Sequence, residues 1–153
     1  MRILALDHGR ARCGVAVSDP TGTLATPLPV VERPDSRRGL AALAALAGER
    51  EVERVVVGLP LTLRGDEGAQ AEEARAFAAR LEERLRVAVE LYDERLTTRQ
   101  AERSGGSAEL DSRAAAHLLE SYLERHRSAA DEAAGALAED RFPDSSAAGP
   151  SPR

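Results

Sequence analysis

The sequence predicts an α/β domain in which helices flank a mixed five-stranded sheet. Three strand-like segments follow one another at the start of the chain, two further buried apolar runs come later, and segments with helical periodicity separate those later runs. Directly successive strands pair antiparallel and strands joined through a helix run parallel, so the expected order is β-β-β-α-β-α-β-α. The 153 residues, 42% of them hydrophobic, suffice for one domain with one core.

The early strands form a predicted meander. The apolar run Arg2–Asp7 has the pattern of a central strand covered on both faces. A tight connection leads to Cys13–Ser18, which is short and rich in small and β-branched residues, and Leu24–Val31 follows after a group of turn residues. Pro27 and Pro29 lack the backbone N–H that a sheet ladder needs, which places the third strand at an edge of the sheet.

Helical periodicity and buried runs alternate through the rest of the domain. Leucines at helical spacing, valine runs, and Gly or Pro punctuation mark the boundaries. The expected elements are a helix over Arg38–Arg50, a strand over Val52–Leu59, a helix over Asp66–Arg86, a strand over Val87–Tyr92, a short helix that Thr97 and Gln100 cap, and a last helix over Ala108–His126.

The C-terminal residues 127–153 differ in composition from the domain, which we place at residues 1–126. They are rich in Ala, Ser, Pro, Asp and Glu and contain few large apolar residues. Such a segment buries too little apolar surface to offset the entropy of ordering, so we expect an acidic, mostly disordered tail.

Bulk properties restrict the cell compartment. Cys13 is the single cysteine, and no Cys/His cluster has the spacing of a zinc site, which favours a reducing environment. The start of the chain lacks the apolar core of a signal peptide, and no apolar run is long enough to cross a bilayer. These features predict a soluble, cytoplasmic protein.

The charge balance argues mildly against a nucleic-acid partner, because the net charge is −5. All 21 basic residues are arginine, however, and the guanidinium fork matches phosphate oxygens better than an ammonium group does. A biased genomic base composition produces the same arginine usage. The distribution of the arginines is therefore more informative than the total.

Carboxylates from distant parts of the sequence are candidates for a metal site. Asp7 ends an apolar strand, where an ionised carboxylate requires a positive partner, although an Asp there also caps a turn. Asp111 shares a stripe with apolar residues of the last helix and so points toward the sheet, while the helix macrodipole also favours an acid there. Of Asp93 and Glu94, alternation lets one point into the cleft and does not decide which.

Such a set of ligands suits a hard cation, because it contains carboxylate oxygens and no His or Cys. We therefore expect Mg²⁺ or Mn²⁺. Two such ions activate a water molecule and stabilise the leaving oxygen in the cleavage of a phosphodiester.

Four arginines lie near these acids in the predicted topology. Arg10 and Arg12 lie in the turn after Asp7, where Gly9 and Gly14 allow a close backbone approach, and we expect them to hold substrate phosphates. Arg64 belongs to a loop after another parallel strand, and Arg95 follows the acids of the fifth strand; each is also consistent with a structural role. A histidine beside Asp7 could assist proton transfer, but we interpret His8 as an exposed turn residue with an incidental role.

Four blocks of this sequence together resemble a known family. The YqgF/RuvX family is described as Holliday junction resolvases and as nucleases that process the 5′ end of precursor 16S ribosomal RNA. The resemblance covers residues 1 to about 125 and rests on Asp7–Asp19, Val57–Leu61 with Gly65, Asp93–Thr98, and Asp111 with Ala114, Ala115, Tyr122 and Leu123.

The resemblance implies a ribonuclease-H-like fold and a phosphodiester hydrolase. It further implies catalytic, metal-binding acids at Asp7, Glu94 and Asp111, and so favours Glu94 over Asp93. The expected function is metal-dependent cleavage of structured RNA during ribosome biogenesis, with resolution of DNA junctions as the alternative.

Two hypotheses from other classes compete with the nuclease. A nucleic-acid or ribosome-associated binding protein would keep the acids for structure. The pattern Asp7-x-Gly-x-x-Arg also occurs in the first phosphate motif of actin-like kinases, but that fold needs two such domains and this chain is too short. Both a monomer and a homodimer are consistent with the sequence, since cutting a junction symmetrically requires a two-fold dimer and trimming RNA does not.

Overall fold

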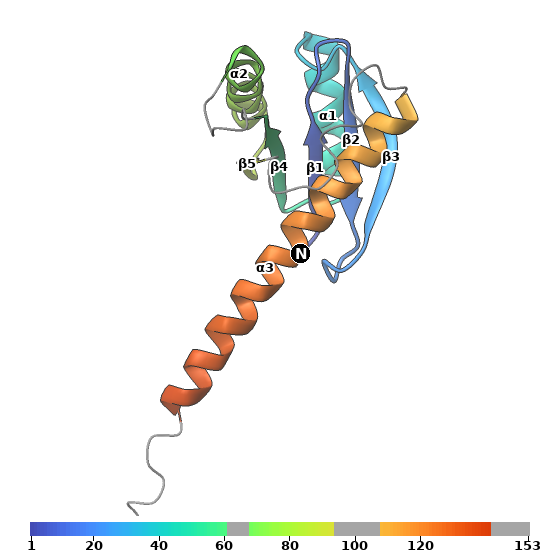
Figure 1. Ribbon diagram of the computed structural model, residues 1–153. Coiled ribbons are helices and arrows are strands. Elements are labelled where there is room, and N and C mark those ends of the chain that lie inside the picture. The colour runs from blue at the N-terminus through green and yellow to red at the C-terminus, as the bar shows by residue number, and fades with distance from the viewer. Residues whose placement is uncertain (61–67, 94–107, 142–153) are drawn as a thin grey trace, which may run out of the picture. The chain divides into compact units, whose positions relative to one another are not determined.

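The computed structural model describes the backbone of residues 1–60, 68–93 and 108–141, and the side chains of these ranges up to residue 127 (Figure 1). The chain divides into a compact unit, Met1–Leu123, and a second unit, Glu124–Arg153. The described elements are β1 (Ile3–Asp7), β2 (Arg12–Ser18), β3 (Ala25–Glu32), α1 (Arg37–Glu49), β4 (Arg54–Leu59), α2 (Ala69–Arg84), β5 (Ala88–Asp93) and α3 (Ala108–Arg141).

The sheet has five strands in the order β3-β2-β1-β4-β5. The first three strands pair antiparallel, and β4 and β5 run parallel to β1. This mixed order confirms the predicted α/β class, a mixed five-stranded sheet flanked by helices. The strand with Pro27 and Pro29 lies at an edge, as the missing N–H groups require.

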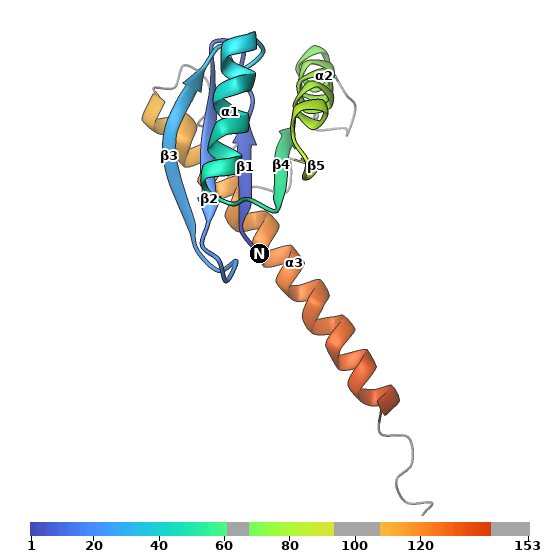
Figure 2. The same cartoon turned by 180° about the vertical axis from the view of Figure 1, so that it is seen from behind.

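Each face of the sheet carries its own core. Alternate residues such as Leu4, Leu6 and Val57 pack with α1 and α2, and their neighbours Ile3, Ala5 and Val56 pack with α3. Views from opposite sides show α3 crossing one face of the sheet and α1 covering the other (Figures 1 and 2). The central strands are therefore covered on both faces, which explains why they read as continuous apolar runs.

The last helix is longer than predicted. We expected it to end at His126 and the following residues to be disordered, but α3 continues to Arg141. Six of the eleven residues 128–138 are alanine, which has the highest helix propensity, and the others are Ser, Asp, Glu, Gly and Leu. A composition that cannot build a core can still form a helix, and residues 127–141 are helical where we expected a disordered tail. Residues 142–153 lie outside the described residues.

Two other predictions also fall outside the described residues, the short helix capped by Thr97 and the loop that contains Arg64. None of the helices in the described part of the chain has the length and apolar character that crossing a bilayer requires.

Candidate active site

Asp7 lies at the carboxyl end of β1 on the side of the sheet that α3 covers. Side chains alternate along a strand, so Asp7 shares a face with Ile3 and Ala5. Both of these residues are buried in the core beneath α3, with exposed fractions of 4% and 0%. The strand therefore places the Asp7 carboxylate at the border of the apolar core between the sheet and α3.

Gly14 brings the second acid beside the first. It is the direct partner of Asp7 in the β1–β2 ladder, and a Cβ atom placed on it would lie 2.0 Å from the backbone oxygen of Asp111. The first turn of α3 thus packs on bare strand backbone next to Asp7. The close backbone approach that we expected at Gly14 is made by the first turn of α3.

The start of α3 is also held to the sheet by a hydrogen bond. The buried hydroxyl Oγ of Ser112 donates to the backbone oxygen of Leu28, at 2.6 Å. Since Leu28 belongs to β3 and Gly14 to β2, the start of the helix is fixed over both of these strands. The inward direction predicted for Asp111 is consistent with this packing, because Ala115, Leu118 and Tyr122 on its stripe are all buried.

Arg12 pairs with Asp111. Its Nε donates to Oδ2 of the carboxylate, and the two side chains are 33% and 25% exposed. We expected Arg12 to hold substrate phosphates, and the structure shows it neutralising one of the predicted metal ligands.

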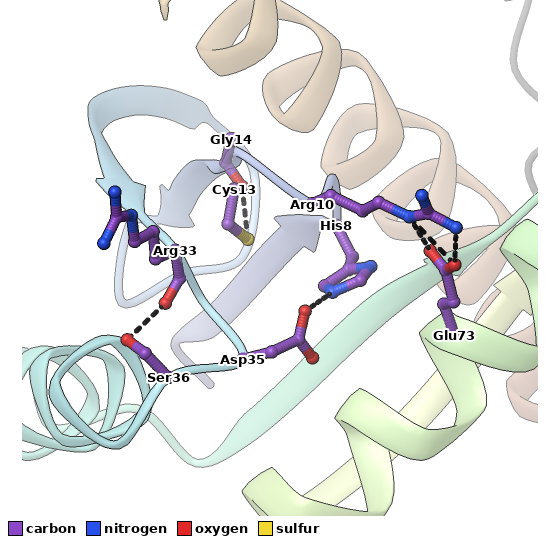
Figure 3. A network of polar contacts seen from close by, with 8 residues as sticks. All are labelled: His8, Arg10, Cys13, Gly14, Arg33, Asp35, Ser36 and Glu73. Atoms are coloured by element: carbon purple, nitrogen blue, oxygen red, sulfur yellow. Dashed lines mark hydrogen bonds and ion pairs between the residues drawn. The ribbon is translucent and has the colours of Figure 1, made fainter.

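Arg10 pairs with a carboxylate of α2. Its guanidinium makes a two-pronged contact with Glu73, in which Nη2 and Nε lie 2.5 Å and 3.0 Å from Oε1 (Figure 3). The hydrogen bond with Arg10 lowers the pKa of Glu73, and the same contact raises that of Arg10. Although 81% of the Arg10 side chain is exposed, the pair ties the β1–β2 turn to α2.

His8 is buried, contrary to our interpretation of it as an exposed turn residue. Its side chain is 4% exposed, and its Nε2 lies 2.7 Å from Oδ2 of Asp35 (Figure 3). Its ring stacks on Phe77, with 4.5 Å between the ring centroids. Neither partner is close in sequence, so no local pattern signals the contact. Through these two contacts, His8 anchors the backbone beside Asp7 to the β3–α1 connection and to α2.

Cys13 reports the electrostatic potential around these acids. Its thiol is fully buried, and burial raises its pKa, as do the negative charges of Asp7, Asp35 and Asp111. Three carboxylates therefore act on one point in the protein.

Not all of the predicted site is described. Glu94, Arg64 and Arg95 lie outside the described residues. Asp93 pairs with Leu59, whose side chain belongs to the core on the α1 and α2 side, so Asp93 occupies the face opposite to Asp7.

The described acids fit a divalent cation in kind but do not complete a site for one. Within the described residues, no three His, Cys, Asp or Glu side chains are arranged to hold a metal ion. The donors that are described, Asp7 and Asp111, are hard carboxylates, and a guanidinium already satisfies the negative charge of Asp111.

Comparison with known proteins gives a family match. The pattern of the family described as "RuvX: Holliday junction resolvase" matches residues 1–125. The chain is 44% identical to the "Putative pre-16S rRNA nuclease" of Chloroflexus aurantiacus over 82% of this chain and 88% of that protein. Proteins of the same name from Myxococcus xanthus and an Anaeromyxobacter species are 43% and 46% identical, with 90% and 99% of their lengths covered.

Among solved structures, RuvC of Thermus thermophilus matches 82% of this chain and 97% of its own chain. The TM-score is 0.49 and the sequence identity is 19%.

Proposed function

Because the chain belongs to the RuvX family, we propose that it is a divalent-metal-dependent nuclease that hydrolyses phosphodiester bonds near the 5′ end of precursor 16S ribosomal RNA. The curated relatives that carry this description are covered over 88% to 99% of their lengths, so the comparison involves essentially whole proteins. Precursor ribosomal RNA is made in the cytoplasm of bacteria, where we also place this protein.

The observation that carries the proposal is the meeting of Asp7 and Asp111 at Gly14. Acids near the two ends of the domain sequence are brought together at the carboxyl end of the central strand β1, and a glycine is required for that approach. A structural role for either acid does not need the other one beside it.

We assign metal binding to Asp7, Glu94 and Asp111. When bound, Mg²⁺ or Mn²⁺ supplies Lewis-acid stabilisation of charge on the phosphate and lowers the pKa of a water molecule. The opposite facing of Asp93 supports Glu94 as the third acid.

The substrate phosphates are assigned to Arg10, Arg12, Arg64 and Arg95. Arginine suits this role because its planar fork binds phosphate oxygens with two parallel hydrogen bonds. The buried contacts of His8 orient the backbone that carries Asp7 and hold it rigid, as a metal ligand requires.

Side-by-side cleavage assays test the proposal. A labelled precursor 16S RNA fragment and a four-way DNA junction are incubated with Mg²⁺ or Mn²⁺ and with wild type, Asp7→Asn or Glu109→Gln. Glu109 is a matched control, because it lies on the same turn of α3 as Asp111 but is exposed and pairs with Arg113.

We expect wild type and Glu109→Gln to cut the RNA, and Asp7→Asn to lose more than about a hundredfold in rate without loss of melting temperature. Cleavage of the junction in place of the RNA would assign the resolvase activity after which the family is described. Binding without cleavage under every metal would favour the non-catalytic binding protein.

A further inference from the structure

The ion pair between Arg12 and Asp111 occupies a carboxylate that the proposed function assigns to the metal. Both side chains are partly exposed, at 33% and 25%, so water competes for each partner and the pair can exchange. A guanidinium and a divalent cation repel each other when both lie beside one carboxylate. Metal binding at Asp111 therefore acts directly on Arg12.

We propose that Arg12 is a displaceable stand-in for the metal, which neutralises Asp111 in the metal-free protein and turns to a substrate phosphate when the cation binds. The inference rests on the proposed function, because it takes Asp111 as a metal ligand. It assigns to one side chain the coupling between the binding of metal and the binding of RNA.

The position of Arg12 keeps its guanidinium near the metal in both states. Arg12 is the first residue of β2, two residues before Gly14, where the strand and the backbone of Asp111 are in contact. A phosphate that approaches a cation at Asp111 therefore comes within reach of the same guanidinium, which binds phosphate oxygens bidentately. Metal and RNA should then increase each other's affinity by the same factor.

The pairing of Arg12 differs from that of other arginines nearby. Arg10 binds Glu73, which is not an expected ligand, so its pair does not compete with a metal. Arg113 binds Glu109 at 3.0 Å on the exposed side of α3, with 61% and 75% of the two side chains exposed. Arg113→Gln also removes one guanidinium, two residues from Asp111 on α3, and leaves the Arg12–Asp111 pair in place, which makes it a matched control.

Calorimetric titration with Mn²⁺ on RNA-free protein tests the competition without any cleavage. Arg12→Gln should bind Mn²⁺ about fivefold more tightly than wild type, the size expected for release of a partly exposed ion pair. Arg113→Gln should match wild type. Arg12→Lys keeps the positive charge and should stay within about twofold of wild type, and it provides a second readout if Arg12→Gln folds poorly.

Fluorescence anisotropy with labelled RNA tests the second half of the inference. Affinity is measured in EDTA and with Ca²⁺, an ion of the same charge that slows cleavage. Wild type and Arg113→Gln should bind RNA about fivefold more tightly with Ca²⁺, and Arg12→Gln should lose most of that gain.

The outcomes separate this inference from the proposed function. If wild type binds Mn²⁺ and Arg12→Gln binds it equally or more weakly, the stand-in role is refuted and the metal nuclease remains. If wild type binds no Mn²⁺ at all, both are refuted. Tighter Mn²⁺ binding by Arg12→Gln together with an unchanged gain in RNA affinity would also overturn the coupling.

Discussion

The two ends of the contact between α3 and the sheet use polar side chains in opposite ways. At the start of the helix, Asp111 and Arg12 form a partly exposed pair beside Asp7. About three turns later, Tyr122 is 1% exposed, accepts a hydrogen bond from Nη1 of Arg54 at 2.8 Å, and packs edge-to-face on Tyr92. One helix therefore carries exchangeable charges at one end and a buried polar network at the other.

The buried end is built to be stable. Burial raises the pKa of Tyr122 to about 12, and its hydrogen bond to Glu90 acts in the same direction. Tyr92 and Ser121 share a further hydrogen bond of 2.9 Å. The second carboxylate oxygen of Glu90 is buried with no partner among the described residues, so this end tolerates little further loss of polar contacts.

The difference indicates that the residues of α3 assigned to catalysis lie at its start, and that the buried polar contacts that stabilise the fold lie about three turns later. A change at the Asp111 end should alter activity more than stability, and a change at the Tyr122 end should do the reverse. Gly14 lies at the junction, because it fixes the helix on the strand and also sets the spacing of the two acids.

Gly14→Ala should therefore have the largest combined effect. The new methyl group would lie 2.0 Å from the backbone oxygen of Asp111, and helix backbone cannot yield locally. We expect a loss of about 1–3 kcal/mol in the free energy of unfolding, and a fall in cleavage rate that exceeds the loss of folded protein. Urea denaturation and single-turnover cleavage measure the two effects. A variant that is destabilised but fully active would show that the spacing of the acids is not critical.

Tyr122→Phe should affect stability and leave catalysis intact. It removes the hydroxyl that links Arg54 to Glu90 and leaves buried polar groups without a partner. The expected cost is about 1–3 kcal/mol in urea denaturation, with kcat unchanged at temperatures where the protein stays folded. An exposed control, Arg113→Gln, should change neither quantity. A fall in kcat for Tyr122→Phe would contradict the separation.

Alkaline pH should give the smallest effect, and like Tyr122→Phe it should lower the stability of the folded protein. The pKa of Tyr122 is about 12 in the folded protein, above the ordinary value of 10.0, so the folded state holds this proton more tightly than the unfolded state does. The contribution of Tyr122 to stability is therefore complete below pH 10 and is lost as the pH rises toward 12. Melting temperatures across this range should fall more steeply for wild type than for Tyr122→Phe, and equal slopes would refute the assignment.

Much of the fold was predictable because each layer left a local pattern. The buried central strands read as apolar runs, the prolines marked the edge strand, and the stripe through Asp111 showed which side of the last helix faces the sheet. These signals depend on residues a few positions apart. The end of α3 was missed because its last residues contain few large apolar side chains, a composition that is also typical of disordered segments. Their high helix propensity does not depend on a core.

The partners within the candidate site were not predictable in this way. His8 meets Asp35 and Phe77, and Arg10 meets Glu73, across distances in sequence that no periodicity spans. The sequence indicated that Arg12 is positive and near the acids, but only the packing at Gly14 shows that it reaches Asp111.

The placement of Asp111 on the last helix has a consequence for how the protein is made. The ribosome delivers Asp7 with the first strand, while α3 emerges after all five strands of the sheet. Until the hydroxyl of Ser112 reaches Leu28 and the helix settles on Gly14, the nascent chain holds one acid without the other. If the two acids act together as proposed, a half-synthesised chain is inert. The ability to cut RNA is then acquired only when α3 packs on the second face of the sheet.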